Sequence, residues 1–440
     1  MIVPMQKPPT KIEPRRSLFV TEKEVLSVFT FSDVMGQLAS KSDSKLTKEK
    51  LFNDWWANAG TSPDPSTGCG PDQTPNNTLL PQFGADYLCP RAEGAETAAN
   101  AFDANSVGGY IPIAVVNRYD LAASRKEGAL DCGEYRMVFA RRSGADAILK
   151  RNFIIFEAVL PNPAPGKVTG CQPIVAKWAM LTSETDPKKR AASLRDFFFN
   201  GIPSAKVAPV ILPQHYGNAT LGAKGQIRTN QFINFGSTLD SQWVLREFNF
   251  VNDGPNSRIA PDRVNANPSD SLFMGGTRSF QTKSFQDEFV AASVAKLARG
   301  TINTMGTDVS EKYNAAESRT GNSDLARSNV DYLKTGNGNQ QFSDRVDAAA
   351  GKKFSSAVFK RAQAMTCAGC HQISNSLDLG DGITWPASLG FVHTSEGALD
   401  MTPGLPPSFD ISPALKDHFL PFRQCRMEAF LRRDWRKVCN

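Results

Sequence analysis

The sequence predicts an α+β protein whose body is built on a mostly antiparallel sheet, followed by a small helical, loop-rich unit at the C-terminal end. Two observations favour this class. Between about residues 108 and 252, short runs rich in Ile, Val, Phe and Tyr are bounded by Gly, Pro, Asn or Asp, a pattern typical of strands joined by turns. The 33 Gly and 28 Pro residues also indicate many turns and long loops. The strand and helix patterns do not alternate as in a parallel sheet, and no internal repeat is present.

The body is expected to begin with a helical stretch at about residues 25–55, followed by five strands and a pair of helices. The helices cover residues 173–181 and 187–199, where Pro187 lies near the start of the second helix and Gly201 follows its end. The strands are expected at 110–116, 134–140, 151–160, 226–233 and 243–251.

The chain divides into four parts by composition. Residues 1–20 are rich in Pro and Lys and are expected to be extended, and residues 21–302 form the α+β body. Residues 303–342 are polar and include a run of Gly and Asn at 335–339, which predicts a linker or a surface insertion. Residues 343–440 form the C-terminal unit, which begins with an amphipathic helix that runs into a pair of cysteines.

Charge and hydropathy exclude two classes of partner. The net charge of +6 over 440 residues is mild, and no basic run is interleaved with aromatic residues as a nucleic-acid interface requires. No stretch approaches the roughly 18 apolar residues of a membrane span. The N-terminus lacks the pattern of a secretory signal, because charged residues follow Arg15 and Arg16 where an apolar segment is needed. We nevertheless expect an exported protein whose signal has been removed, because of its cysteines.

Six of the eight cysteines predict disulfides. An even number remains once the closely spaced pair near residue 370 is set aside, and pairing of sequence neighbours closes the shortest loops. Such bonds need an oxidising compartment, so the expected location is periplasmic or extracellular. The alternative is six reduced, buried thiols. The expected pairs are Cys69–Cys89, Cys132–Cys171 and Cys425–Cys439.

The segment Cys367-Ala368-Gly369-Cys370-His371 carries the strongest chemical signal. The pattern Cys-x-x-Cys-His is the attachment signature of c-type haem, and chance alone gives on the order of 0.001 occurrences in a chain with this composition. A thioredoxin-like dithiol is disfavoured because the pair follows a helix and not a strand. A structural zinc site is disfavoured because no second pair of Cys or His has a matching spacing.

Residues 343–440 resemble a c-type cytochrome domain: a helix, the Cys-x-x-Cys-His segment, a loop-rich stretch and a C-terminal helix. The rest of the chain resembles exported bacterial proteins of no assigned family. The resemblance implies one covalent haem c on Cys367 and Cys370, with His371 as an iron ligand. It also implies a redox partner protein.

The sequence does not decide the second axial ligand of the haem iron. The candidates are Met401, His393 and a position without a protein ligand. Met401 lies in a Pro/Gly loop of the kind that carries the distal methionine in small cytochromes c. His393 would give bis-histidine ligation and a lower potential. An open site would allow small molecules to reach the iron.

Three functions follow from these expectations. The first is electron transfer outside the cytoplasm by a mono-haem c-type cytochrome. The second is a haem enzyme, peroxidase-like or oxygenase-like, with an open iron site. The third is an exported binding or surface protein in which a haem, a metal or the dithiol is structural. No catalytic residue is identified.

Two further residues are singled out in the body. Glu157 lies in the middle of an expected strand, and a buried carboxylate there would need Arg136 or Arg246 as an ion-pair partner. His215 lies in an expected loop, where it is a weaker candidate for binding a metal or a substrate.

Overall fold

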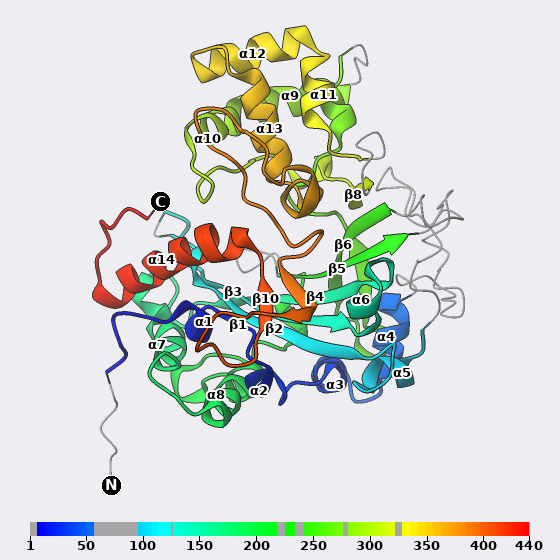
Figure 1. The fold of residues 1–440 in the computed structure, drawn as a ribbon, viewed down its shortest axis with the longest axis vertical. Coiled ribbons are helices and arrows are strands. Elements are labelled where there is room, and N and C mark those ends of the chain that lie inside the picture. The colour runs from blue at the N-terminus through cyan, green and yellow to red at the C-terminus, as the bar shows by residue number, and fades with distance from the viewer. Residues whose placement is uncertain are drawn as a thin grey trace.

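The computed structural model describes residues 7–56, 96–124, 126–217, 225–233, 242–275, 280–321 and 328–439. A large antiparallel sheet lies at the centre, with helices beneath it and a helical lobe above one end (Figure 1). The expected α+β class with a mostly antiparallel sheet is therefore confirmed.

Eight strands form the main sheet, in the order β1-β2-β3-β4-β5-β6-β7, with β8 also paired to β6. Every pairing is antiparallel. All five expected strands are present, and β1, β7 and β8 are additional. The strands are β1 Phe19–Val20, β2 Tyr110–Arg118, β3 Asp131–Arg141, β4 Asn152–Pro161, β5 Gln226–Ile233, β6 Gln242–Val251, β7 Arg258–Asp262 and β8 Glu317–Gly321.

One face of the sheet is covered by helices and forms the larger core. Tyr135, Met137 and Phe139 alternate along β3 and are fully buried in this core, because side chains two apart on a strand share a face. Figure 1 shows the helices below the sheet. They include α3 Phe31–Ser42, α4 Lys48–Trp56, α7 Gln172–Met180 and α8 Pro187–Asn200, and the last two match the expected helical pair.

A second core lies in the upper lobe. Phe273, Tyr332 and Phe359 are buried there among the helices. The range 303–342, expected to be a linker or a surface insertion, contains β8 and α11. The domain boundaries stay a prediction. The lobe contains α9 Phe280–Ala292, α10 Val294–Arg299, α11 Tyr332–Asn337, α12 Gln340–Ala350 and α13 Ser355–Ala364.

Residues 343–440 contribute to both cores. The helices α12 and α13 pack in the upper lobe, whereas β9 Thr394–Leu399, β10 Phe409–Ile411 and α14 Leu420–Arg432 adjoin the body. Ile411, Met427 and Phe430 belong to the larger of the two cores. The structure therefore does not show the expected cytochrome c-like C-terminal domain, because the segment's apolar residues are buried against two different parts of the molecule.

The N-terminal segment packs against the C-terminal helix. A short helix, α1 Pro14–Ser17, precedes β1. The backbone N–H of Ile12 donates to Glu428 Oε1 at 3.1 Å, and Gln424 Nε2 donates to the Ile12 carbonyl at 3.0 Å. The two ends of the described chain thus stabilise each other.

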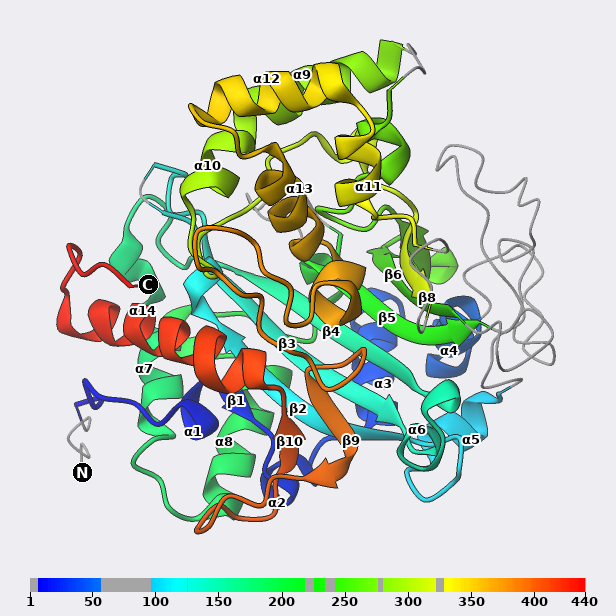
Figure 2. The ribbon, with the colours of Figure 1, turned by 45° about the horizontal axis from the view of Figure 1, so that its top comes forward.

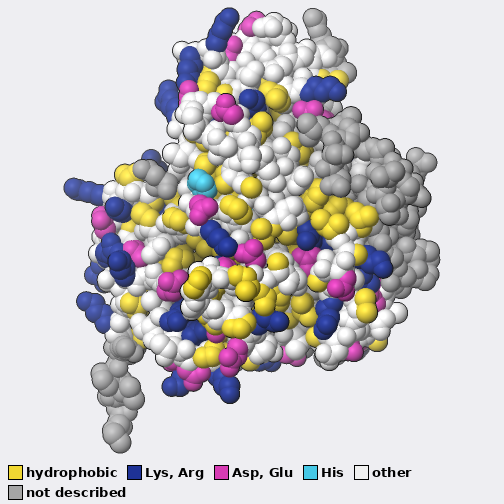
Figure 3. All heavy atoms as spheres, in the orientation of Figure 1, with side chains coloured by type: hydrophobic (Ala, Val, Ile, Leu, Met, Phe, Trp, Pro, Cys, Tyr) yellow, Lys and Arg dark blue, Asp and Glu magenta, His cyan; other side chains and the backbone are white. Residues whose placement is uncertain are grey.

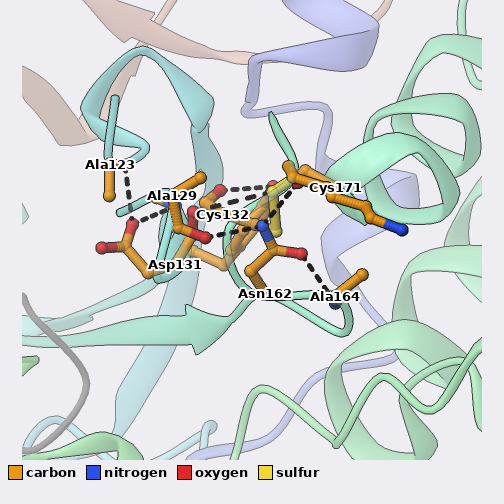
Figure 4. Close-up of a disulfide and its surroundings, with 10 residues drawn as sticks. Ala123, Ala129, Asp131, Cys132, Asn162, Ala164 and Cys171 are labelled. Carbon is orange, nitrogen blue, oxygen red and sulfur yellow. Dashed lines mark hydrogen bonds between the residues drawn. A yellow bond between two sulfur atoms is a disulfide. The ribbon is translucent and has the colours of Figure 1, made fainter. Parts of the chain in front are cut away.

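Two disulfides confirm part of the predicted pairing. Cys132 at the start of β3 is bonded to Cys171 just before α7, and Cys425 in α14 is bonded to Cys439. Figure 4 shows the first bond beside Asn162, which donates to the Ala129 carbonyl at 2.7 Å. The expected Cys69–Cys89 pair lies outside the described residues. The two bonds are compatible with an oxidising compartment.

The surface carries mixed charge. Basic and acidic side chains are interspersed on the face shown in Figure 3, in keeping with the mild net charge of +6. Within the described ranges, no helix combines the length and apolarity needed to cross a membrane.

Candidate binding cavity

A cavity of about 590 Å³ lies between the open face of the main sheet and the C-terminal segments. This volume is within the range of about 300–1,000 Å³ that is usual for small-molecule sites. The cavity walls combine aromatic and aliphatic side chains with a few arginines. Figure 2 shows the segment after α13 lying above the sheet, with α14 beside it.

The cavity floor is made by alternate residues of four neighbouring strands. These side chains point away from the helix-covered core, because successive residues of a strand point to opposite faces of the sheet and the core residues take the alternate positions. The floor therefore mixes arginines with branched and aromatic residues. It consists of Val116 and Arg118 from β2, Arg136 and Val138 from β3, Phe153 and Ile155 from β4, and Arg228 and Asn230 from β5.

The two cysteines of the Cys-x-x-Cys-His segment form part of the roof. The helix α13 ends near Met365, and a π-helical turn at Gly369–Ile373 follows. Thr366 stabilises this junction, because its Oγ1 accepts from the Gly369 N–H at 2.9 Å and its carbonyl from the Cys370 N–H at 2.8 Å. Gly369 is required here, since a Cβ atom would lie 1.7 Å from the Gln363 carbonyl oxygen.

Both roof cysteines are half-buried free thiols that line the cavity. Burial raises the pKa of Cys367 to about 11 and that of Cys370 to about 12. His393 Nε2 lies 3.3 Å from Cys370 Sγ, and its Nδ1 lies 2.8 Å from Ser412 Oγ. At neutral pH these sulfurs are therefore protonated, weak nucleophiles.

His371 is held as a neutral imidazole. Its Nδ1 lies 2.8 Å from the Phe391 carbonyl oxygen, so this nitrogen carries the proton. Its ring stacks on Trp243 with centroids 5.3 Å apart. Burial is the main cause that lowers the pKa of His371 to about 4. His371 and His393 also contact each other, with ring centroids 4.6 Å apart.

An arginine–carboxylate network runs across the cavity floor. Its members face one another on neighbouring strands: Arg136 lies opposite Glu157, and Arg228 lies opposite Glu247. Glu157 is 1% exposed and contacts both Arg136 Nη1, at 3.0 Å, and Arg228 Nη1, at 3.3 Å. The network consists of Asp120, Arg118, Glu134, Arg136, Glu157, Arg228 and Glu247.

The expected ion pair of Glu157 is confirmed for one of its two candidates. Arg136 is a partner, as predicted, and Arg228 is a second partner that the sequence analysis did not propose. Arg246 is not; it contacts Glu317 instead, with Nε 3.5 Å from Oε2. The alternation of side chains along the strands could have identified Arg228. Once the strand register is known, Arg228 lies on the same face of the sheet as Arg136 and Glu157.

The expectation of a covalent haem c, and with it the resemblance to a c-type cytochrome, is wrong. Across the part of the chain that the structure describes, no three His, Cys, Asp or Glu side chains gather into a group able to hold a metal ion. An ion held between two opposed imidazoles, at about 2 Å from each nitrogen, would separate the rings of His371 and His393 further than their 4.6 Å.

The structure brings most of the predicted site residues together, although not for the expected purpose. Cys367, Cys370, His371 and His393 all line the cavity. Met401 lies between β9 and β10 and is 85% exposed, well outside the cavity lining. Its Pro/Gly loop is a surface turn and does not return to the roof.

His215 is a structural residue of the body. It is buried, and its Nδ1 lies 3.2 Å from the Val210 carbonyl oxygen. Desolvation lowers the pKa of His215 to about 4. It does not line the cavity.

Sequence reasoning missed Arg423 on α14, a buried cation that lines the cavity. No motif marks this position, since its neighbours read as an ordinary amphipathic helix. Its place beside the floor depends on the long-range packing of α14.

Comparisons with protein-family models, with curated proteins and with solved structures found no match. The functional proposal therefore rests on the cavity alone.

Proposed function

We propose that this chain is an exported small-molecule binding protein, periplasmic or extracellular, whose cavity holds an apolar ligand. The main support for this proposal is the cavity, which has a volume of about 590 Å³ and is lined mainly by apolar side chains, with a few polar groups that converge on it. This combination is the usual form of a small-molecule site. The two disulfides support the proposed location.

The other functions have less support. Electron transfer, a redox partner and haem catalysis all rested on the haem expectation and lose their support with it. Thiol–disulfide exchange needs a thiolate, and the raised pKa values of Cys367 and Cys370 disfavour one at neutral pH. In the proposed binding function, Cys367 and Cys370 serve as part of the cavity wall.

A neutral fluorescent probe, N-phenyl-1-naphthylamine, tests the proposal. At about 0.3 kcal/mol per non-hydrogen atom, this small ligand is expected to bind one site with a dissociation constant on the order of 100 µM or tighter. Binding is measured by the rise in probe fluorescence during titration.

Two matched variants locate the bound probe. Val138→Trp places a large side chain on the cavity floor, and Val107→Trp adds the same side chain at a position that is exposed on the surface. We expect at least a tenfold loss of affinity in the first and no change in the second, with both folded by circular dichroism. Unsaturable binding, or equal affinity in both variants, would contradict the proposal.

A further inference from the structure

Arg423 is a buried cation without a close partner. Its side chain lines the cavity, yet the residue is only 7% exposed. Among the described residues, the acid that contacts it is Asp120, whose Oδ1 lies 3.9 Å from Arg423 Nε. This distance is too long for a hydrogen bond. Burying a guanidinium is unfavourable unless hydrogen bonds compensate it.

Asp120 is already engaged by another arginine. Arg118 donates to both carboxylate oxygens of Asp120, through Nε at 3.0 Å and Nη2 at 2.9 Å. This bidentate arrangement is the strong form of the pair. Asp120 therefore serves two cations, and Arg423 has the poorer geometry. Burial and the nearby charge of Arg118 lower the pKa of Arg423 well below its usual range.

Three of the four arginines that line the cavity are paired with carboxylates, and Arg423 is the one with the weakest compensation. Glu157 and Glu247 lie on the same face of the sheet as Arg136 and Arg228, but they are almost fully buried and do not line the cavity. The charged side chains that line it are Arg118, Asp120, Arg136, Arg228 and Arg423. A ligand in the cavity therefore meets Arg423 as the least compensated cation, and an anionic group would supply the partner that it lacks.

Apolar side chains also pack beside Arg423. Phe419 lies under its guanidinium, with the carbon centre 5.9 Å from the ring centroid. Leu121 and Phe422 also line the cavity. A ligand group that reaches Arg423 must therefore be attached to an apolar body, which the aromatic and aliphatic walls accommodate.

We infer that the cavity binds an apolar organic anion and that Arg423 holds its anionic group, a carboxylate or a sulfonate. This inference rests on the proposed function and adds the chemical class of the ligand. The guanidinium donates two parallel hydrogen bonds to such a group. It would then gain the partner that Asp120 supplies only at 3.9 Å.

Two probes with the same ring system test the inference. 1-Anilinonaphthalene-8-sulfonate carries a sulfonate, and N-phenyl-1-naphthylamine is its neutral counterpart. Each is titrated into the full-length wild-type chain and into Arg423→Gln, Arg423→Lys and the control Arg426→Gln. Arg426 lies on the same helix and is exposed.

We expect Arg423→Gln to weaken binding of the sulfonate by about 10- to 100-fold, the usual effect of losing a charge-assisted hydrogen bond. Binding of the neutral probe should change less than twofold. Arg423→Lys should recover part of the loss, and Arg426→Gln should resemble wild type. Thermal unfolding checks that each variant is folded.

Two results would overturn the inference in different ways. In the first, the wild type binds the neutral probe, but Arg423→Gln either binds the sulfonate as tightly as wild type or loses affinity for both probes equally. Arg423 then does not bind the anionic group, and the proposed function still stands. If neither probe binds the wild type, the proposed function fails and the inference fails with it.

Discussion

Glu157 is the central carboxylate beneath the cavity, and replacing it by glutamine perturbs the arginine–carboxylate network most directly. The substitution keeps the shape of the side chain and removes its charge. Arg136 and Arg228 then lose the carboxylate that lies between them at 3.0 and 3.3 Å. We expect the free energy of unfolding to fall, because two partly buried cations become undercompensated.

The expected loss follows from the remaining partners. Removing one member of a buried ion pair destabilises a protein by about 3–5 kcal/mol. Arg136 keeps Glu134 at 2.6 Å, and Arg228 keeps Glu247 at 3.1 Å, so neither cation is left unpaired. We therefore expect Glu157→Gln to lower the free energy of unfolding by about 2–4 kcal/mol.

Glu134→Gln is the matched control. The Glu134 side chain is 14% exposed, against 1% for Glu157, and among the described residues its ion-pair partner is Arg136. Removing its charge is expected to lower the free energy of unfolding by about 1 kcal/mol. Both variants and the wild type are unfolded in urea at pH 7.5, and their free energies of unfolding are compared using one shared dependence on urea concentration (m-value). The reasoning is refuted if Glu157→Gln loses less than Glu134→Gln.

Three further predictions concern the disulfides, the thiols and acid stability. Replacing Cys132 and Cys171 by alanine opens a crosslink between residues 39 apart, and thermal unfolding should show a loss of about 4 kcal/mol; an unchanged midpoint would contradict this. At pH 8, Cys367 and Cys370 should react with an aromatic disulfide reagent about 10²- to 10³-fold more slowly than in the urea-unfolded chain, because burial raises their pKa values to about 11 and about 12. Equal rates would contradict the burial, and thiols unreactive even in urea would show that both sulfurs are covalently modified. His215 has a folded pKa of about 4 against 6.5 in the unfolded chain, so the unfolded state binds more protons between these values. The free energy of unfolding should thus fall as pH drops from 6.5 to 4, by up to about 1.4 kcal/mol per pH unit for each such histidine, and His215→Asn should reduce the slope measured in urea.

The body of the fold was predictable because its signals are local. Tyr135, Met137 and Phe139 alternate with Glu134, Arg136 and Val138, and this parity separates the core face from the cavity face without knowledge of the tertiary structure. The additional strands were not predictable in this way. β1 has two residues and β7 and β8 have five each, so their pairing depends on distant strands and not on their own pattern.

The candidate site was predicted in part. The rarity of the Cys-x-x-Cys-His segment singled out Cys367, Cys370 and His371, and all three line the candidate cavity. The identity of the bound group did not follow, because it depends on which other side chains converge there. Met401 shows the difficulty: its loop composition suited a ligand, yet the pairing of β9 with β10 leaves it on the surface.

The most direct test of the binding cavity is the mass of the intact protein saturated with 1-anilinonaphthalene-8-sulfonate, measured under native and then under denaturing conditions. The account predicts a native mass that exceeds the polypeptide by one probe molecule, and a denatured mass equal to the polypeptide alone. A native mass with no added probe would contradict the cavity as a binding site. An excess mass that persists after denaturation would contradict the assignment of Cys367 and Cys370 as free thiols.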